Sequence, residues 1–211
     1  MGDFLLDFRR RGERSEAVGL LRFFEDMAVD RIERDRFTLF VTRAGSDRLW
    51  APFESADGIV IALAGRVALS PADWETAARI EGSGGLACRA LCRAYHERGV
   101  AGLLGLGGAF AVHVFDPQRN VYHLVCDFGG ALPCYTRAGA GELFSSHPDV
   151  LAAAADESQD AWDLTSMAQF VSTGVVTHPH SYYRRVESLE YGCVHSFDLA
   201  APGTPRRSTA R

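Results

Sequence analysis

Three side chains that can bind metal or act as nucleophiles, Cys88, Cys92 and His96, recur at four-residue spacing in one segment. Residues four apart share one face of a helix, so a helical segment would bring these side chains together. A zinc site there would need a fourth ligand and outer hydrogen-bond partners for its histidine. The same spacing is typical of an apolar stripe packed in a core. We favour the core interpretation and expect no metal site.

Two glycine-rich segments could in principle hold phosphate. Ser83-Gly-Gly-Leu-Ala-Cys88 has the outline of a pyrophosphate loop, but it follows a predicted helix end where such a loop needs a buried strand. Gly107-Gly108 precedes a strand, whereas a phosphate cradle opens a helix. We interpret the first segment as a turn between helices and the second as a position of close backbone packing.

Other nucleophile and ligand patterns are weak. His178-Pro-His180 lies in a predicted loop, where two histidines are usually solvated. Composition alone leaves a Ser/His/Asp triad open, but the sequence has no Gly-x-Ser-x-Gly elbow to support one. The chain also contains no lysine, since all 22 basic residues are arginine. This excludes a P-loop and a pyridoxal Schiff base, and we expect no cofactor.

Composition describes an ordinary globular domain. The 211 residues are 47% hydrophobic, with a net charge of −5. Nucleic-acid binding usually needs a basic face, so a nucleic-acid partner is not expected. No apolar run is long enough to span a bilayer, and no membrane association is expected. Five cysteines, an odd number set in apolar segments, indicate reduced thiols in a cytoplasmic protein: Cys88, Cys92, Cys126, Cys134 and Cys193.

Hydrophobic periodicity and capping residues predict the elements that must position these groups. Helices are expected at 15–28, from Ser70-Pro71 onward, at 86–98, at 149–155 and at 163–172. Strands are expected at 37–42, 58–63, 108–115, 121–126, 143–145 and 193–199. Antiparallel strands with helices at both ends and in the middle favour an α+β layered protein. We expect one domain over 1–199 and a linker or disordered tail over 200–211.

The segment from Leu104 to Tyr135 resembles the class II glutamine amidotransferase domain of asparagine synthetases. There, a Gly-x-Phe-Ala strand, an Asp turn and a second strand lead to Arg-Asp-x-x-Gly-x-x-Pro-Leu-Tyr. The matching residues here are Gly108, Phe110, Ala111, Asp116, Asp127, Gly130, Pro133 and Tyr135. The resemblance implies an N-terminal-nucleophile hydrolase fold, a four-layer αββα sandwich of two stacked antiparallel sheets.

The catalytic residues of that family do not carry over. Active members use a cysteine directly after the initiator methionine, with its own α-amine as base, and that position holds Gly2 here. The family's oxyanion-binding Asn-Gly pair matches Ala64 and Gly65, and Arg66 replaces the glutamate that follows.

Two further substrate-binding positions are degenerate. A Gly-Ser-Asp that grips the substrate amine matches a segment ending in Gly84, without the carboxylate, and Arg48 matches an arginine that holds the substrate carboxylate. The resemblance therefore predicts a substrate pocket that no longer hydrolyses glutamine.

The resemblance implies three alternative functions. We favour an inactive domain that acts as scaffold for an ATP-dependent synthetase domain or subunit, as in β-lactam synthetases and lasso-peptide cyclases. The first alternative is an active amidotransferase with an unrecognised nucleophile, which a glutaminase assay would identify. The second is a stand-alone module that binds a small ligand or a peptide.

Overall fold

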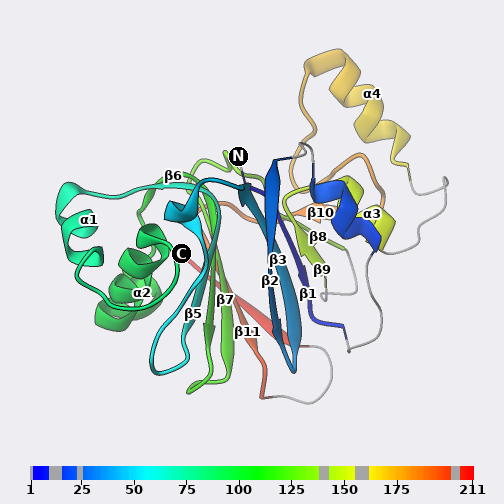
Figure 1. The fold of residues 1–211 in the computed structure, drawn as a ribbon. Helices are drawn as coiled ribbons and strands as arrows, with labels where there is room; N and C mark the ends of the chain where they lie inside the picture. Colours follow the sequence, from blue (N-terminus) through cyan, green and yellow to red (C-terminus); the bar gives the residue numbers. More distant parts are fainter. Residues whose placement is uncertain (1, 10–15, 23–25, 138–142, 155–161, 201–204) are drawn as a thin grey trace.

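Two antiparallel six-stranded sheets packed face to face form the body of the protein in a computed structural model (Figure 1). The structure describes residues 2–9, 16–22, 26–137, 143–154, 162–200 and 205–211. Helices cover the outer face of each sheet, so the chain forms four layers. The predicted α+β sandwich of two stacked sheets is confirmed.

The first sheet has the strand order β10-β8-β9-β1-β3-β2. Its central strand, β1, pairs with β3 on one side and β9 on the other, so the N-terminal segment lies inside the sheet. The strands are β1 (Phe4–Asp7), β2 (Met27–Arg34), β3 (Phe37–Ala44), β8 (Tyr135–Arg137), β9 (Leu143–Ser145) and β10 (Val186–Ser188).

The second sheet has the strand order β12-β11-β7-β6-β5-β4. Its centre is the β5–β6–β7 meander, in which Ala64 lies opposite Ala111 and Ala111 lies opposite Cys126. The strands are β4 (Phe53–Glu54), β5 (Val60–Ala68), β6 (Gly107–Asp116), β7 (Val121–Cys126), β11 (Val194–Asp198) and β12 (Arg206–Ala210).

Alternation along β6 divides the core into two layers. Phe110, Val112 and Val114 pack toward the helices in a cluster that includes Leu91. Ala111, on the opposite face, packs between the sheets with residues such as Phe4. Successive side chains of a strand point to opposite faces, so one strand supplies both layers.

Local capping chemistry sets the helices outside the second sheet. Ser70 and Asp73 form a reciprocal capping box at the start of α1 (Pro71–Ala77), with Pro71 in its first turn. α2 (Leu86–Arg98) ends at Gly99, as predicted. Single 3-10 turns flank this layer at η2 (Arg48–Trp50) and η3 (Gly99–Gly102).

The other face carries α3 (Pro148–Ala154), which packs beside the 3-10 turn η1 (Glu16–Leu21). The helix α4 (Leu164–Thr173) stands away from the body of the sandwich (Figure 1). Asp163 caps its N-terminus, and Gly174 closes it in the left-handed conformation. No helix among the described residues is long and apolar enough to cross a membrane.

Two predictions of local structure are wrong. The helix expected over 15–28 appears only as η1, and Met27 already begins β2. β2 has a mixed-charge sequence that hides its strand character, and pairing with β3 along its whole length forms it. The expected linker from residue 200 contains β12, which pairs with β11 from Arg206 to Ala210.

Candidate functional site

Gly2, at the position of the family's nucleophile, is buried at the entrance to β1. The backbone nitrogen and carbonyl of the next residue, Asp3, hydrogen-bond to Thr42 of β3. A methyl group on Gly2 would overlap the carbonyl oxygen of Thr42 and lie 3.2 Å from the backbone nitrogen of Gly65. The structure therefore brings Gly2 and Gly65 together, but it leaves no space for a side chain on Gly2.

The positions of the family's oxyanion-binding pair lie on β5. Ala64 is fully buried between the sheets and carries only a methyl group. Gly65 has a φ of 83°, and a side chain there would overlap the carbonyl oxygen of Ala109. Arg66 turns outward, with its guanidinium 3.3 Å from Asp47 and over the ring of Trp50. Of this group, Gly65 alone presents a backbone N–H near residue 2.

Arg48 begins η2, and Gly84 packs on Pro52 and Phe53, which follow that turn. Arg48 is exposed at the start of η2. Gly84 has a φ of 116°, and a side chain on it would lie 2.5 Å from the carbonyl oxygen of Pro52. A substrate carboxylate and amine would need charged groups aimed at Gly2. The structure shows an exposed arginine and a tightly packed glycine instead.

Asp127 organises the loop between β7 and β8. Its carboxylate accepts hydrogen bonds from the backbone nitrogens of Phe110 at 3.2 Å, Ala131 at 2.9 Å and Leu132 at 2.8 Å. Gly130, with a φ of 61°, lies under the ring of Tyr191, where a side chain would collide. Asp127 is 1% exposed, so its role is to hold the loop against β6.

The remaining motif residues are structural. Gly108 has a φ of 123° and packs directly on the backbone of Arg66, while Phe110 is buried under the helices. Pro133 is half-buried in the loop. Tyr135 begins β8 opposite Ser145 and Ser188, and burial raises the pKa of its hydroxyl to about 12. These positions support the loop and the sheet but supply no reactive group.

A polar network beside Gly2 was not predicted from the sequence. Oδ1 of Asp3 accepts hydrogen bonds from Ser146 Oγ at 3.1 Å and contacts His147 Nε2 at 2.9 Å. Ser146 Oγ also accepts from the backbone nitrogen of Phe4 at 3.1 Å. The only signal for it in the sequence is the polar run Ser145-Ser146-His147 at the end of β9. The network ties β1 to the end of β9.

The five cysteines differ sharply in acidity. Hydrogen bonding from Cys134, together with a hydrogen bond and charge from His195, lowers the pKa of Cys126 to about 6, against the opposing effect of burial. Burial raises the pKa of the Cys88 and Cys193 thiols, and it raises the pKa of Cys92 to about 11. The hydrogen bond to Cys126 raises the pKa of Cys134. Cys126 is nevertheless only 3% exposed.

Cys88 and Cys92 lie in the apolar layer under α2, as the core interpretation predicted. His96 extends instead toward Asp57, with 3.6 Å between Nε2 and Oδ1. Among the residues that the structure describes, no three His, Cys, Asp or Glu side chains are grouped as metal ligands.

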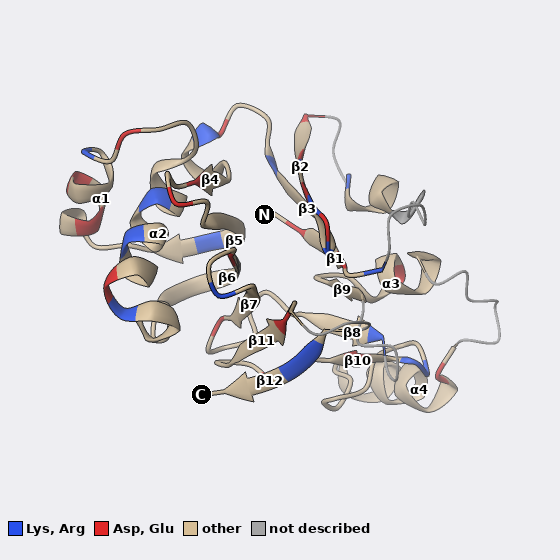
Figure 2. Cartoon of the chain, turned by 90° about the horizontal axis from the view of Figure 1, so that it is seen from below, with Lys and Arg blue, Asp and Glu red and all other residues tan. Residues whose placement is uncertain are grey.

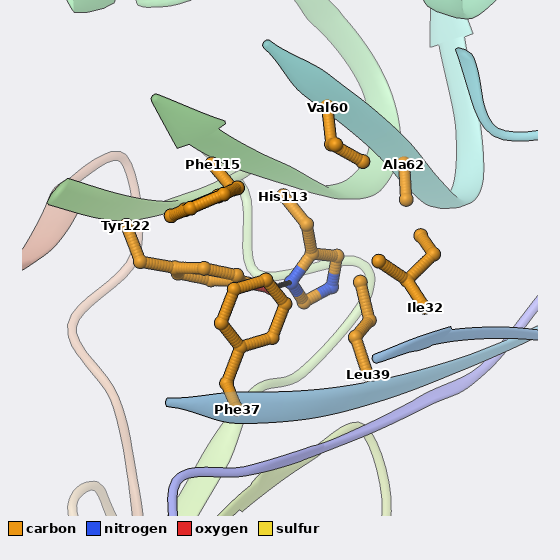
Figure 3. A pocket seen from close by; sticks show the side chains of 8 residues that line it. All are labelled: Ile32, Phe37, Leu39, Val60, Ala62, His113, Phe115 and Tyr122. Carbon is orange, nitrogen blue, oxygen red and sulfur yellow. Dashed lines mark hydrogen bonds between the residues drawn. The ribbon is translucent and has the colours of Figure 1, made fainter. Parts of the chain in front are cut away.

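A buried histidine, His113, lies between the sheets (Figure 3). His113 Nδ1 is 2.8 Å from the hydroxyl of Tyr122. Its Nε2 has no hydrogen-bond partner among the described residues, and its apolar surroundings include Leu39 and Phe37. Burial lowers the pKa of His113 to about 3, so the ring is neutral at pH 7.

Comparison with known proteins agrees with this geometry. The family model described as a glutamine amidotransferase domain matches residues 86–205, more than half of the chain. The matched segment includes the motif from Gly108 to Tyr135, whereas Gly2 and Gly65 precede it. No curated protein matches the chain.

Two solved structures share the fold across the whole chain. One is described as the allosteric regulatory enzyme of purine biosynthesis, with a TM-score of 0.59 and 12% identity. The other is glutamine phosphoribosylpyrophosphate amidotransferase from B. subtilis in complex with ADP and GMP, with a TM-score of 0.58 and 12% identity. The chain covers 49% of each, so it spans about half the length of these proteins.

Proposed function

Because this chain belongs to the glutamine amidotransferase domain family, we propose that it is a catalytically inactive member of it. In this proposal it serves as scaffold for the ATP-dependent synthetase half of an asparagine-synthetase-like, amide-forming ligase. The observation that carries the proposal is Gly2, a residue with no side chain at the position of the family's nucleophile. An acyl-enzyme needs a sulfur or oxygen atom to bond to the amide carbon, and glycine has neither.

The packing around Gly2 supports the loss of the reaction. A cysteine there would place its Cβ against the carbonyl oxygen of Thr42, and the backbone pairing of β1 with β3 begins directly beside that contact. The backbone of Thr42 therefore occupies the volume that the side chain of a nucleophile at residue 2 would need. Restoring the thiol alone would strain the strand pair before it created an active centre.

The surroundings of Gly65 support the same conclusion. Replacement of the family's asparagine by Ala64 removes one donor to the oxyanion, and losing one such donor typically costs a factor of about 10²–10³ in rate. Gly65 keeps its backbone nitrogen close to residue 2, but the side-chain amide that residue 64 supplies in the family is replaced by a methyl group. The site thus keeps the architecture of the family and lacks the groups that stabilise charge.

An exposed apolar helix face supports a scaffolding role. Leu164, Val171 and Val175 on and after α4 are 68%, 86% and 62% exposed. Exposed apolar side chains gathered on one element commonly mark a protein contact. The similar solved structures are about twice as long, so each has a further half that this chain does not match.

A glutaminase assay tests the loss of activity. We expect no ammonia release from glutamine above the uncatalysed rate, with either the natural chain or Gly2→Cys. The double variant Gly2→Cys, Ala64→Asn is the matched control for the oxyanion site, and we expect it to be inactive as well because Thr42 still fills the pocket. Ammonia release from glutamine by the natural chain would contradict the proposed loss of activity.

A reconstitution experiment tests the scaffold. The partner is an ATP-dependent synthetase whose sequence carries a Ser-Gly-Gly-x-Asp-Ser loop, purified with and without this chain. We expect a stable complex, and amide formation that needs ATP but not glutamine. Val171→Asp should weaken the complex, whereas Thr165→Asp, a polar exposed position on the same helix, should not. Full synthetase activity without this chain would contradict the proposal.

One observation favours the alternative of an active enzyme with another nucleophile. Cys126 has a lowered pKa and a histidine partner, as nucleophilic cysteines do. The Cys126 thiol is buried between the sheets, however, and among the described residues no opening leads glutamine to it. Ammonia release that disappears in Cys126→Ser but persists in Cys193→Ser would favour this alternative.

A further inference from the structure

A cavity of about 450 Å³ opens at the end of the sandwich where the β2–β3 turn, the β6–β7 turn and the end of β11 meet. Phe37, the first residue of β3, lines this cavity. Thr42, the residue against which Gly2 packs, lies five residues further along the same strand, or about 17 Å at the usual rise of a strand. The cavity is therefore separate from the degenerate pocket. Its volume is in the range of sites that bind small molecules.

Apolar side chains form the floor of the cavity. Phe37 from the first sheet and Phe115 from the second meet edge to face, with 5.2 Å between their ring centroids (Figure 3). Leu199, directly after β11, adds an aliphatic wall. The space around His113, which the same two rings border, is too narrow for a water molecule. A ligand in the cavity would therefore rest on the two rings, and an aromatic ligand would gain more from this contact than an aliphatic ligand of equal area.

Two arginines border the cavity on the side of the first sheet. Arg34 lies two residues after Ile32 on β2, and Ile32 packs against the core between the sheets. Alternate residues of a strand share a face, so Arg34 is directed to the same side as Ile32. Arg34 and Arg36 line the cavity and are half-buried, whereas Asp35 between them is exposed. Water screens half-buried charges less than exposed ones, so the two guanidinium groups dominate the charge at the cavity.

The contacts that these arginines make within the chain leave donors for a ligand. Arg34 forms an ion pair at 2.8 Å with Glu54, which does not line the cavity, and donates to the carbonyl of Glu33 at 3.1 Å. A guanidinium carries five N–H donors in a planar fork, so a residue with such contacts can still bind the two oxygens of a carboxylate. The charge and the donors together favour an anionic ligand.

Backbone contacts hold the walls of the cavity in place. The Leu199 nitrogen donates to the carbonyl of Asn120 at 2.9 Å, which joins the end of β11 to the β6–β7 turn. The Asp116 carboxylate accepts a hydrogen bond from the Gln118 nitrogen at 3.0 Å and so fixes that turn. β2 and β3 pair along their whole length, up to the turn that carries the arginines. A cavity with fixed walls loses little conformational freedom when a ligand binds.

We propose that this cavity binds a small planar aromatic carboxylate. The ring of the ligand lies on Phe37 and Phe115, and its carboxylate accepts hydrogen bonds from the guanidinium groups of Arg34 and Arg36. A bicyclic ring such as indole, with a short arm to the carboxylate, is well within the size of the cavity. The site does not include Gly2, so this inference depends neither on the proposed loss of glutaminase activity nor on the scaffold role.

Isothermal titration of the natural chain with indole-3-acetate tests the proposal. Indole-3-acetamide has the same shape without the charge, tryptamine has the opposite charge, and decanoate is a carboxylate without a ring. We expect indole-3-acetate to bind with a dissociation constant below about 1 mM and roughly tenfold more tightly than each of the other three. No binding of indole-3-acetate in this range, or equal affinity for the acid and the amide, would overturn the proposal. Tighter binding of decanoate would refute the aromatic class of ligand.

Substitutions locate the bound ligand. Arg36→Gln should weaken the binding of indole-3-acetate about tenfold and leave the binding of the amide nearly unchanged. Arg36 is chosen because Arg34→Gln would also break the ion pair with Glu54. Arg31→Gln, at an exposed position of β2 that does not line the cavity, is the matched control and should leave the affinity unchanged. Ala200→Trp, at an exposed position that does line the cavity, should fill it and abolish binding.

Circular dichroism confirms that each variant is folded, and the comparison of acid with amide on the natural chain stands without the variants. Indole-3-acetate that binds Arg36→Gln and Ala200→Trp as tightly as the natural chain would lie at another site, and the assignment of the cavity would then be wrong. An equal loss of affinity in Arg36→Gln and Arg31→Gln would show a general effect of net charge and would count against a carboxylate bound at Arg36.

Discussion

At the scale of single residues, His113 should make the fold sensitive to acid. Its pKa is about 3 in the folded chain against 6.5 in water, so the unfolded chain binds the extra proton first. The contribution of neutral His113 to the free energy of unfolding is fully present above pH 6.5, and it is lost as the pH falls from 6.5 toward 3. His123, with a pKa lowered by burial to about 4, adds to the same trend.

We therefore expect stability to fall between pH 7 and pH 4.5, with about 2–3 kcal/mol of the loss due to His113. Urea unfolding at the two pH values measures the difference. The double variant His113→Phe, Tyr122→Phe removes both partners of the buried hydrogen bond and should reduce the loss. His180→Gln, in an exposed loop, is the control and should not. Equal losses in all three proteins would contradict the assignment.

Gly65 is a second residue at which a single substitution should measurably lower the stability of the fold. Gly65→Ala would force a side chain to a φ of 83° and against the carbonyl of Ala109, so we expect a destabilisation of roughly 2–4 kcal/mol. Gly107→Ala is the matched control on the neighbouring strand, because a methyl group there meets only the Ala68 side chain at 3.6 Å. Thermal unfolding compares the two, and similar melting temperatures would refute the packing argument.

At the scale of elements, β12 completes one edge of the second sheet. All five of its residues are exposed, so its attachment depends on the backbone ladder with β11. Removing residues 205–211 should cost about 1 kcal/mol of stability and lower the melting temperature by a few degrees. It should also leave the outer edge of β11 unpaired, while the pairing of β11 with β7 remains. Calorimetry and size-exclusion chromatography test both effects. Replacing Arg206 and Arg207 with Ser keeps the backbone and should preserve stability.

Elements with a strong local signal could be predicted, and those formed by distant pairing could not. The predicted helix 86–98 is confirmed to the residue as α2, because apolar periodicity and Gly99 are both local features. The strand and turn patterns of β6 and β7 were equally clear. β1, although central, spans only Phe4–Asp7, and its place is set by β3 and β9 far along the chain.

The residues of the candidate site could be identified from the sequence, but their arrangement in space could not. The motif identified Gly2, Ala64 and Gly65, and the structure places Gly2 beside Gly65. The overlap with Thr42 and the Asp3–His147 contact depend on strand register. Register between remote strands is not written in any single segment of the sequence.

At the scale of the whole molecule, the retained features are those that a stacked pair of sheets needs. Asp127, Gly108 and Gly130 hold close backbone contacts, and each still matches the family. The groups that would do chemistry, at Gly2 and Ala64, are the ones that differ. This division agrees with the proposal that the chain keeps the fold for its surfaces and does not hydrolyse glutamine.

The four outer strands of the two sheets share a property that matters for solubility. β4 and β10 are two and three residues long, β12 begins with two arginines, and β2 carries four charged residues, Asp30, Arg31, Glu33 and Arg34 (Figure 2). Asp30 on β2 is bound by Arg43 across the strand pair, at 2.6 Å. A strand from a second molecule that paired with either sheet would have to pair with a very short edge strand or with an edge strand that carries charged side chains. Growth into fibrils by strand addition is thereby opposed at every border, even when the chain is concentrated without a partner.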